Sequence, residues 1–180
     1  RQTSQVISQL YPMGFLPEIH SVIRDKYVTV GVEGKFGENW NWDLSQVVGG
    51  NSFRFNVTNS NNASQYALGA AAPTEFYAGK LLFSQYTSNF NISRDFGKEV
   101  GLKSFNIAAG AEYRKDAYQI QAGEEASYFN YAPTSGRVGG AQVFPGFQPS
   151  NAVEENRNVF GGYIDLETDI TDKLLINAAG

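Results

Sequence analysis

The chain has 180 residues, with 14 basic and 18 acidic side chains, a formal net charge of −4 and no cysteine. The lack of cysteine excludes disulfides and thiolate metal sites, and the mildly acidic balance excludes the basic footprint of a nucleic-acid-binding protein. Glycine and aromatic residues are plentiful, so the composition predicts an all-β chain. No apolar run approaches the ~20 residues of a transmembrane helix, but a barrel strand needs only about 9–11 residues.

The first predicted strand spans residues 27–36 and follows an irregular stretch, residues 1–23. Valines at alternate positions share one face of this strand, and Thr29, Glu33 and Lys35 share the other. Successive strand side chains point to opposite faces, so the strand is expected to have an apolar face and a polar face.

The second predicted strand, residues 40–57, begins with two tryptophans beside a tight turn at residues 37–39. Trp40 and Trp42 lie on its apolar face. This placement is typical of the aromatic girdle of a membrane barrel, and equally of an apolar patch in the core of a soluble sheet.

Four further strands are predicted from the same alternation. They cover residues 76–96, 104–118, 159–170 and 174–180. All six strands are expected to pair as an antiparallel up-and-down sheet, which forms one partial β-barrel domain over residues 1–180.

The predicted connections alternate in length. Those at residues 37–39, 96–101 and 171–173 are short, whereas those at residues 58–74 and 123–156 are long. All short turns then lie at one end of the strands and all long loops at the other, as in an outer-membrane β-barrel. The predicted strands at residues 40–57, 76–96 and 104–118 also exceed the usual 3–10 residues of strands in globular proteins.

An acidic row on the strand at residues 159–170 is predicted to face the barrel lumen. Asp165, Glu167 and Asp169 alternate with apolar residues, and their spacing of roughly 6.6 Å per two residues is too wide for one calcium ion without a loop. We therefore expect a hydrated acidic lumen wall and no metal site.

The sequence contains no recognisable catalytic motif. His20 is the only histidine and has no oxyanion-loop signature nearby, so a Ser-His-Asp site is not expected. The prediction is a protein that is not an enzyme and that carries no cofactor.

Aromatic residues in the loop at residues 123–156 are the candidate ligand contacts. Tyr128, Phe129 and Tyr131 lie among polar residues and could bind a ring-bearing or sugar ligand, or pack within the loop. Phe144 and Phe147 flank Pro145-Gly146 and are expected to pack the loop against its neighbours.

Several segments resemble the barrel region of TonB-dependent outer-membrane receptors. The resemblance covers most of the chain, and its motifs are features of barrel strands. They are Leu16-Pro17-Glu18-Ile19, residues 52–60, residues 76–81, Phe144-Pro145-Gly146-Phe147 with Pro149, Arg157, residues 163–175 and the final Asn177-Ala178-Ala179-Gly180.

This resemblance implies a transmembrane barrel of about 22 strands that is plugged by an N-terminal domain. Such transporters import siderophore-bound iron, haem, cobalamin or oligosaccharides across the outer membrane of a Gram-negative bacterium. Implied partners are outer-membrane lipid, the substrate, alone or with a surface lipoprotein, and the TonB system, which would act through parts of the protein outside this sequence. Nucleic acid is not an implied partner.

The sequence is expected to be a fragment, because it starts without a methionine and stops within a strand. It has no recognisable plug domain, and six strands cannot close a barrel of that size. The alternative interpretation is a soluble β-sandwich, such as a carbohydrate-binding or adhesin module, in which a second sheet covers the apolar strand faces.

Overall fold

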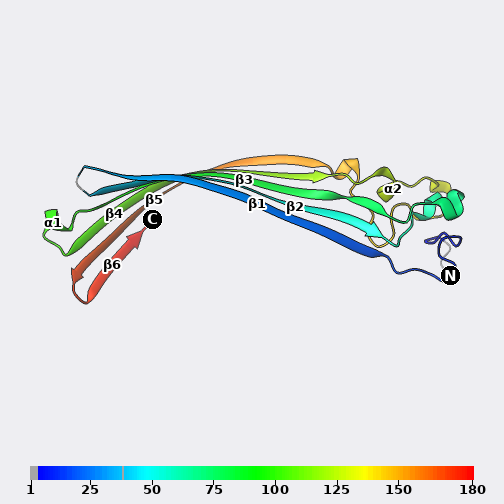
Figure 1. Ribbon diagram of the computed structural model, residues 1–180, viewed down its shortest axis with the longest axis horizontal. Coiled ribbons are helices and arrows are strands. Elements are labelled where there is room, and N and C mark those ends of the chain that lie inside the picture. The colour runs from blue at the N-terminus through cyan, green and yellow to red at the C-terminus, as the bar shows by residue number, and fades with distance from the viewer. Residues whose placement is uncertain (1–3, 38) are drawn as a thin grey trace. The chain divides into compact units, whose positions relative to one another are not determined.

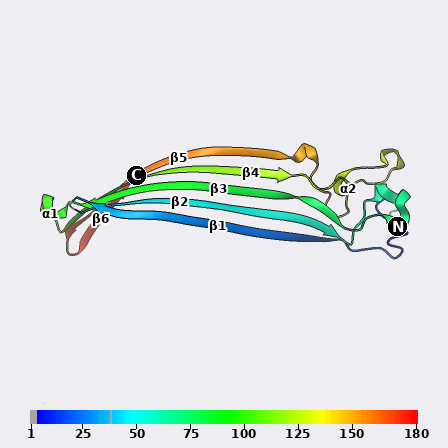
Figure 2. The same cartoon turned by 45° about the horizontal axis from the view of Figure 1, so that its top comes forward.

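A computed structural model describes residues 4–37 and 39–180. Six strands pair in chain order, β1-β2-β3-β4-β5-β6, in a single sheet (Figure 1). A view from a second direction shows the same succession of strands (Figure 2). The predicted all-β, antiparallel up-and-down sheet is therefore confirmed. It is not closed, since β1 and β6 are its edges.

The strands are long. They are β1 (Glu18–Phe36), β2 (Trp40–Thr58), β3 (Phe76–Asp95), β4 (Ser104–Gln121), β5 (Val153–Thr171) and β6 (Leu174–Ala179). β1 begins at Glu18, nine residues before the predicted start, and β5 begins six residues before its predicted start. Both strands extend into stretches without regular apolar alternation, because backbone pairing continues beyond the alternating residues.

The connections contain short helices. These are the 3-10 helices η1 (Ala63–Ala71), η2 (Pro133–Ser135) and η3 (Pro149–Asn151), and the α-helices α1 (Gly97–Val100) and α2 (Glu125–Tyr128). The connections predicted as irregular loops are thus partly helical.

The chain divides into two compact units, and the division falls within the strands. Unit 1 comprises residues 1–25, 50–83 and 117–155, and unit 2 comprises residues 26–49, 84–116 and 156–180. Both long loops belong to unit 1, and all three short turns belong to unit 2.

Unit 1 contains the buried apolar core of the described chain. Val57, Phe76, Ala78 and Ala141 form one cluster, each at most 2% exposed. Two of them come from β3 and one from β2, while Ala141 comes from the second long loop. This loop therefore folds onto the strands that carry it.

Unit 2 is a sheet with two different faces. Phe36 and Trp40 stack on one face with ring centroids 5.9 Å apart, and Tyr113 and Phe160 meet at 4.8 Å. The described part of unit 2 has no large apolar side chain that is fully buried. Its apolar face is therefore uncovered in the isolated chain.

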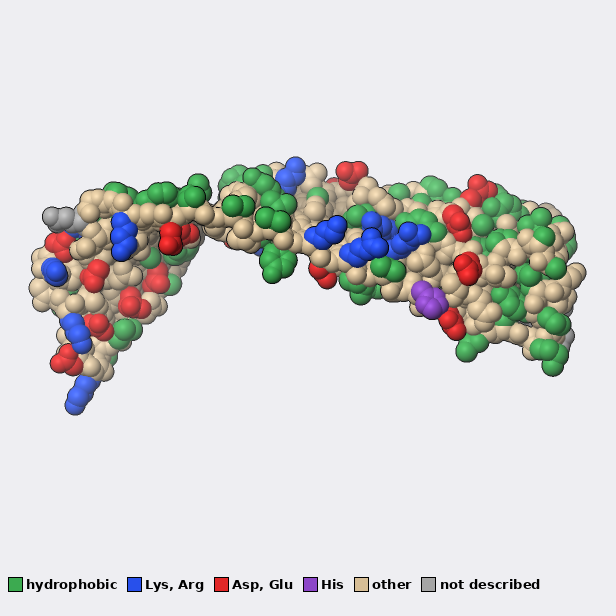
Figure 3. Space-filling view, in the orientation of Figure 1, with side chains coloured by type: hydrophobic (Ala, Val, Ile, Leu, Met, Phe, Trp, Pro, Cys, Tyr) green, Lys and Arg blue, Asp and Glu red, His purple; other side chains and the backbone are tan. Residues whose placement is uncertain are grey.

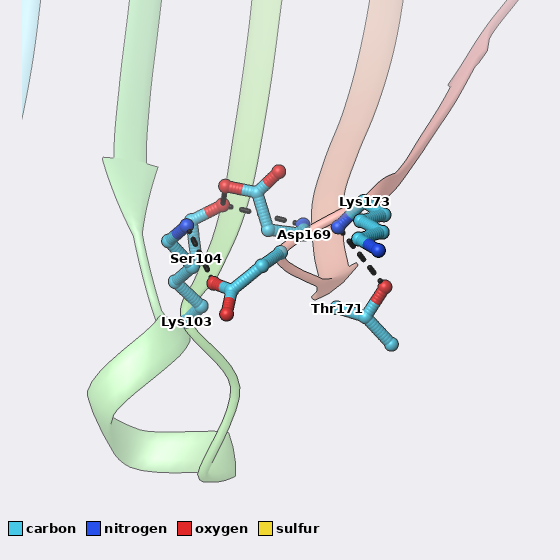
Figure 4. Close-up of polar contacts among 6 residues, drawn as sticks. Lys103, Ser104, Asp169, Thr171 and Lys173 are labelled. Atoms are coloured by element: carbon cyan, nitrogen blue, oxygen red, sulfur yellow. Dashed lines mark hydrogen bonds and ion pairs between the residues drawn. The ribbon is translucent and has the colours of Figure 1, made fainter.

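Local polar contacts fix the short turns of unit 2. Asp95 Oδ1 accepts hydrogen bonds from the backbone N–H groups of Gly97 (2.7 Å) and Phe105 (3.0 Å), which ties the ends of β3 and β4 together. Gly101 ends α1 in a left-handed conformation, φ 73°, which glycine adopts without a steric cost. At the next turn, the N–H of Lys173 donates to Thr171 Oγ1 (Figure 4).

Candidate functional site

Two adjacent asparagines form the centre of the loop layer in unit 1. The side chain of Asn61 accepts a hydrogen bond from the N–H of Ile7 (2.9 Å) and donates to the carbonyl of Gln5. The N–H of Gln142 donates to the Asn61 carbonyl. Asn61 thus joins three separate stretches of chain: the N-terminal segment and both long loops.

Asn62 fastens the first long loop to the second. Its amide donates to the carbonyls of Ala126 (2.9 Å) and Phe129 (2.8 Å), and its Oδ1 accepts from the N–H and hydroxyl of Ser64. Asn62 is 0% exposed, so all of these bonds are shielded from water. Residues 60–64 are therefore a buried, hydrogen-bonded core of the loops.

Ser127 has a similar role in the second long loop, where it hydrogen-bonds to several loop residues. Its carbonyl accepts from the N–H groups of Ala141 and Gly146, each at 2.9 Å, and its hydroxyl donates to the Glu124 carbonyl. A Cβ at Gly123 would lie 2.6 Å from Ser127 Oγ, and one at Gly146 would overlap the same oxygen. Glycine at these two positions lets the loop close around Ser127.

The expected packing role of Phe144 and Phe147 agrees with their positions. Their ring centroids lie 5.3 and 5.9 Å from that of Phe55 in β2. The N–H of Phe147 also donates to the Ala78 carbonyl in β3. Both phenylalanines hold the loop against the sheet.

The three predicted ligand-contact residues lie on and after α2. Phe129 and Tyr131 are 47% and 42% exposed, with ring centroids 5.0 Å apart, and Tyr128 is half-buried. The N–H of Tyr131 donates to Ser64 Oγ, which places this aromatic pair beside η1. Partial burial raises the pKa of the Tyr131 phenol, and the nearby Glu125 carboxylate raises it further.

A second aromatic contact in these loops was missed from the sequence. The guanidinium of Arg137 lies 4.4 Å from the centroid of Tyr66 in η1, and it also donates to the Val6 carbonyl. Tyr66 is 42% exposed. The two residues are far apart in the chain, so no local pattern could have paired them.

Two of the three residues of the predicted acidic row on β5 accept hydrogen bonds from neighbouring strands. Asp165 accepts from the Asn177 amide (2.7 Å), and Asp169 accepts from the Ser104 hydroxyl (2.9 Å) (Figure 4). Glu167 is exposed. Within residues 4–37 and 39–180, no group of three or more acidic, histidine or cysteine residues could hold a metal ion.

Polar side chains bridge the strands on the same face of unit 2. Asn91 donates to Asp43 (3.0 Å) and accepts from the Tyr163 hydroxyl (3.0 Å). Asp116, 5% exposed, accepts from Gln85 and Arg157, each at 2.9 Å. Sequence alternation identifies this face as polar but does not identify these partners.

A cavity of about 490 Å³ lies on this polar face, with Glu33, Lys35, Asp43, Asn91 and Tyr163 among its lining residues. Its lining carries acidic and basic side chains and the amides of Asn41 and Asn91, which suits contact with another polar surface. His20, by contrast, lies in unit 1, where its Nε2 is 3.0 Å from Glu18 Oε2 in an exposed pair. It takes no part in the cavity.

Comparison with known proteins gives no assignment. The chain matches no family model, no curated protein and no solved structure. No helix in the described residues is long and apolar enough to cross a membrane.

Proposed function

We propose that the chain forms part of the wall of a TonB-dependent outer-membrane transporter that imports a bulky, scarce nutrient. One observation carries the proposal: the sheet of unit 2 has an uncovered apolar face and a hydrogen-bonded polar face. A barrel wall needs these two faces, since one meets lipid and the other meets a polar lumen.

Residue exposure on the apolar face supports contact with lipid. Val28 and Val30 of β1 are each 64% exposed, and Phe160 and Ile164 of β5 are 79% and 58% exposed. Soluble monomers rarely expose large contiguous apolar patches. Lipid would cover these side chains along their whole length.

An aromatic cluster beside the short turns supports a membrane interface there. Trp40 stacks on Phe36 and meets Phe96 edge-on, both with ring centroids 5.9 Å apart. The Arg94 guanidinium lies 4.5 Å from the Phe96 centroid. Aromatic girdles flanked by basic side chains occupy the headgroup region of barrels.

The loop layer of unit 1 supports a role in substrate capture. Its buried Asn62 joins both long loops through hydrogen bonds, while Phe129, Tyr131 and Tyr66 have exposed rings. Rigid aromatic groups bind sugars and ring-bearing ligands at a low entropic cost. The acidic row at Asp165, Glu167 and Asp169 is proposed to line the lumen.

Membrane insertion is the direct test of the proposed wall. The full-length gene product, expressed in a Gram-negative host, should fractionate with the outer membrane and show the heat-dependent electrophoretic mobility of a folded barrel. Recovery as a detergent-free soluble monomer would instead support the β-sandwich binding module.

The role of the loops has a separate test. Tyr128→Ala with Tyr131→Ala in the full-length receptor should weaken nutrient uptake and ligand affinity without changing membrane insertion. Tyr27→Ala, on an exposed strand position, is the matched control. Uptake and affinity that stay the same in the loop variant would remove these residues from the binding surface.

A further inference from the structure

A second cavity, of about 560 Å³, lies on the sheet in unit 1 and is lined by three basic residues from three strands. They are Arg24 of β1, Arg54 of β2 and Lys80 of β3. Figure 3 shows basic side chains gathered on one face of the molecule. The remaining lining includes Asn56 and Tyr77, which supply polar and aromatic surface.

Backbone geometry explains how β3 contributes two residues to this cavity. Tyr77 and Lys80 are three positions apart, so simple alternation would send them to opposite faces. Gly79 between them has a φ of +112°, a conformation that L side chains rarely adopt. The shift at this glycine brings Lys80 to the face that Tyr77 occupies.

Arg54 is held in place before any ligand binds. Its Nε donates to Asn56 Oδ1 (3.2 Å), and its guanidinium lies 4.5 Å from the centroid of Tyr77. Glu124 in turn fixes Tyr77, since its carboxylate accepts from the Tyr77 N–H and its own N–H donates to the Tyr77 carbonyl. The remaining N–H groups of the guanidinium can bind an anion.

The three positive charges are not neutralised by the described protein. None of the ion pairs among residues 4–37 and 39–180 includes Arg24, Arg54 or Lys80. Two acidic residues of β1 lie nearby in the chain. Glu18 pairs with His20. Asp25, which follows Arg24 and therefore points to the opposite face of the strand, accepts a hydrogen bond from the Asn51 amide. Three cations that form no ion pair within the described residues surround one cavity, and such a cluster attracts an anion and repels further cations.

We infer that this cavity binds a phosphate ester, with Arg54 and Lys80 as its main contacts. A guanidinium forms paired hydrogen bonds with phosphate oxygens, and a lysine ammonium adds a point charge. Tyr77 lines the same cavity, and its ring lies against the Arg54 guanidinium. The phosphate can belong to a soluble nutrient or to a lipid headgroup. Only the role of this site in uptake rests on the proposed transporter function.

The test compares two double variants of the full-length gene product in neutral detergent. Arg54→Gln with Lys80→Gln removes two charges from the cavity. Lys98→Gln with Lys173→Gln removes two from exposed positions at the short turns. Calorimetry with glucose 6-phosphate, with glucose as the neutral counterpart, probes a soluble ester. Native mass spectrometry with added phosphatidylglycerol probes a headgroup.

The cavity variant should bind one of the phosphate probes at least about tenfold more weakly than the unmodified protein, and the control variant should stay within about twofold. The probe that responds identifies the source of the phosphate. Equal effects of the two variants, or no binding of either probe by the unmodified protein, would overturn the inference. Membrane fractionation of the unmodified protein reports on the proposed transporter independently of this result.

Discussion

At the scale of single residues, two asparagines are buried in a loop that the sequence suggests is exposed to solvent. Residues 59–65 are polar and contain no apolar anchor larger than alanine, which is typical of a surface connection. Asn61 and Asn62 are nevertheless 0% exposed, because their side chains satisfy backbone groups of other segments. A buried polar side chain is tolerated when every partner is paired.

The first prediction concerns Asn62. Asn62→Ala removes the donor for two carbonyls and the acceptor for two Ser64 groups, so it should destabilise the loop layer by roughly 2–4 kcal/mol. Hydrogen exchange should become faster in both long loops. Asn156→Ala, at an exposed position of β5, should leave their exchange unchanged.

The second prediction concerns pH. Burial and Glu125 raise the pKa of Tyr131 above its ordinary value of 10.0, so the folded loop favours the protonated phenol. This stabilisation is complete below the unfolded pKa and is lost as the pH rises through the folded one. Proteolysis of the loop at residues 122–152 should therefore increase above about pH 10.

Two variants test whether ionisation of Tyr131 causes this increase in proteolysis at alkaline pH. Tyr131→Phe cannot ionise, so it should remove the pH-dependent step, whereas Tyr27→Phe on β1 should keep it. An alkaline step of the same size in Tyr131→Phe would assign the opening to another group.

At the scale of elements, alternation in the sequence predicts the faces of the strands well. Val28, Val30 and Val32 of β1 are all more than half exposed on the apolar face, as their spacing indicates. The start of β1 could not be predicted in the same way. Residues 18–26 mix charged, polar and apolar types, and their strand conformation depends on pairing with a distant part of the chain.

The loop contacts could not be predicted for a related reason. Hydrogen bonds from Asn62 to Ala126 and Phe129 join residues 64 and 67 positions apart, and they depend on backbone carbonyls that have no side-chain signature. Aromatic content alone pointed to residues 128–131. The partners that hold them, and the Arg137 contact with Tyr66, come from tertiary structure.

The third prediction tests the proposed contact between the apolar face of β1 and lipid. Val30→Lys places a charge on the apolar face and should destabilise the folded protein in membranes by up to about 2–4 kcal/mol. Thr29→Lys adds the same charge to the polar face and should have little effect. Urea unfolding in lipid vesicles measures the difference, and equal losses in the two variants would contradict the assignment of the faces.

At the scale of the whole molecule, the sheet has two unpaired edges, β1 and β6. Exposed edge strands present free backbone donors and acceptors to other chains, and here an uncovered apolar face accompanies them. In the proposed transporter, neighbouring strands would pair with these edges and lipid would cover the apolar face.

The fourth prediction follows from these edges. Residues 1–180 produced alone in aqueous buffer should associate into large species and bind a hydrophobic dye, whereas the full-length product in detergent should stay monodisperse. Light scattering and dye fluorescence measure the two outcomes. A stable, dye-free monomer of residues 1–180 in buffer would argue that the apolar face is covered within the chain.

The closure of the second long loop around Ser127 determines which positions of this loop can accept substitutions or insertions. Gly123 and Gly146 leave no room for a side chain, whereas the intervening tip at residues 133–136 is exposed and makes mostly local contacts. Insertions at the tip should therefore be accepted, because the glycine-lined closure keeps the flanking chain in register. New surface chemistry can evolve, or be engineered, at this tip without rebuilding the fold beneath it.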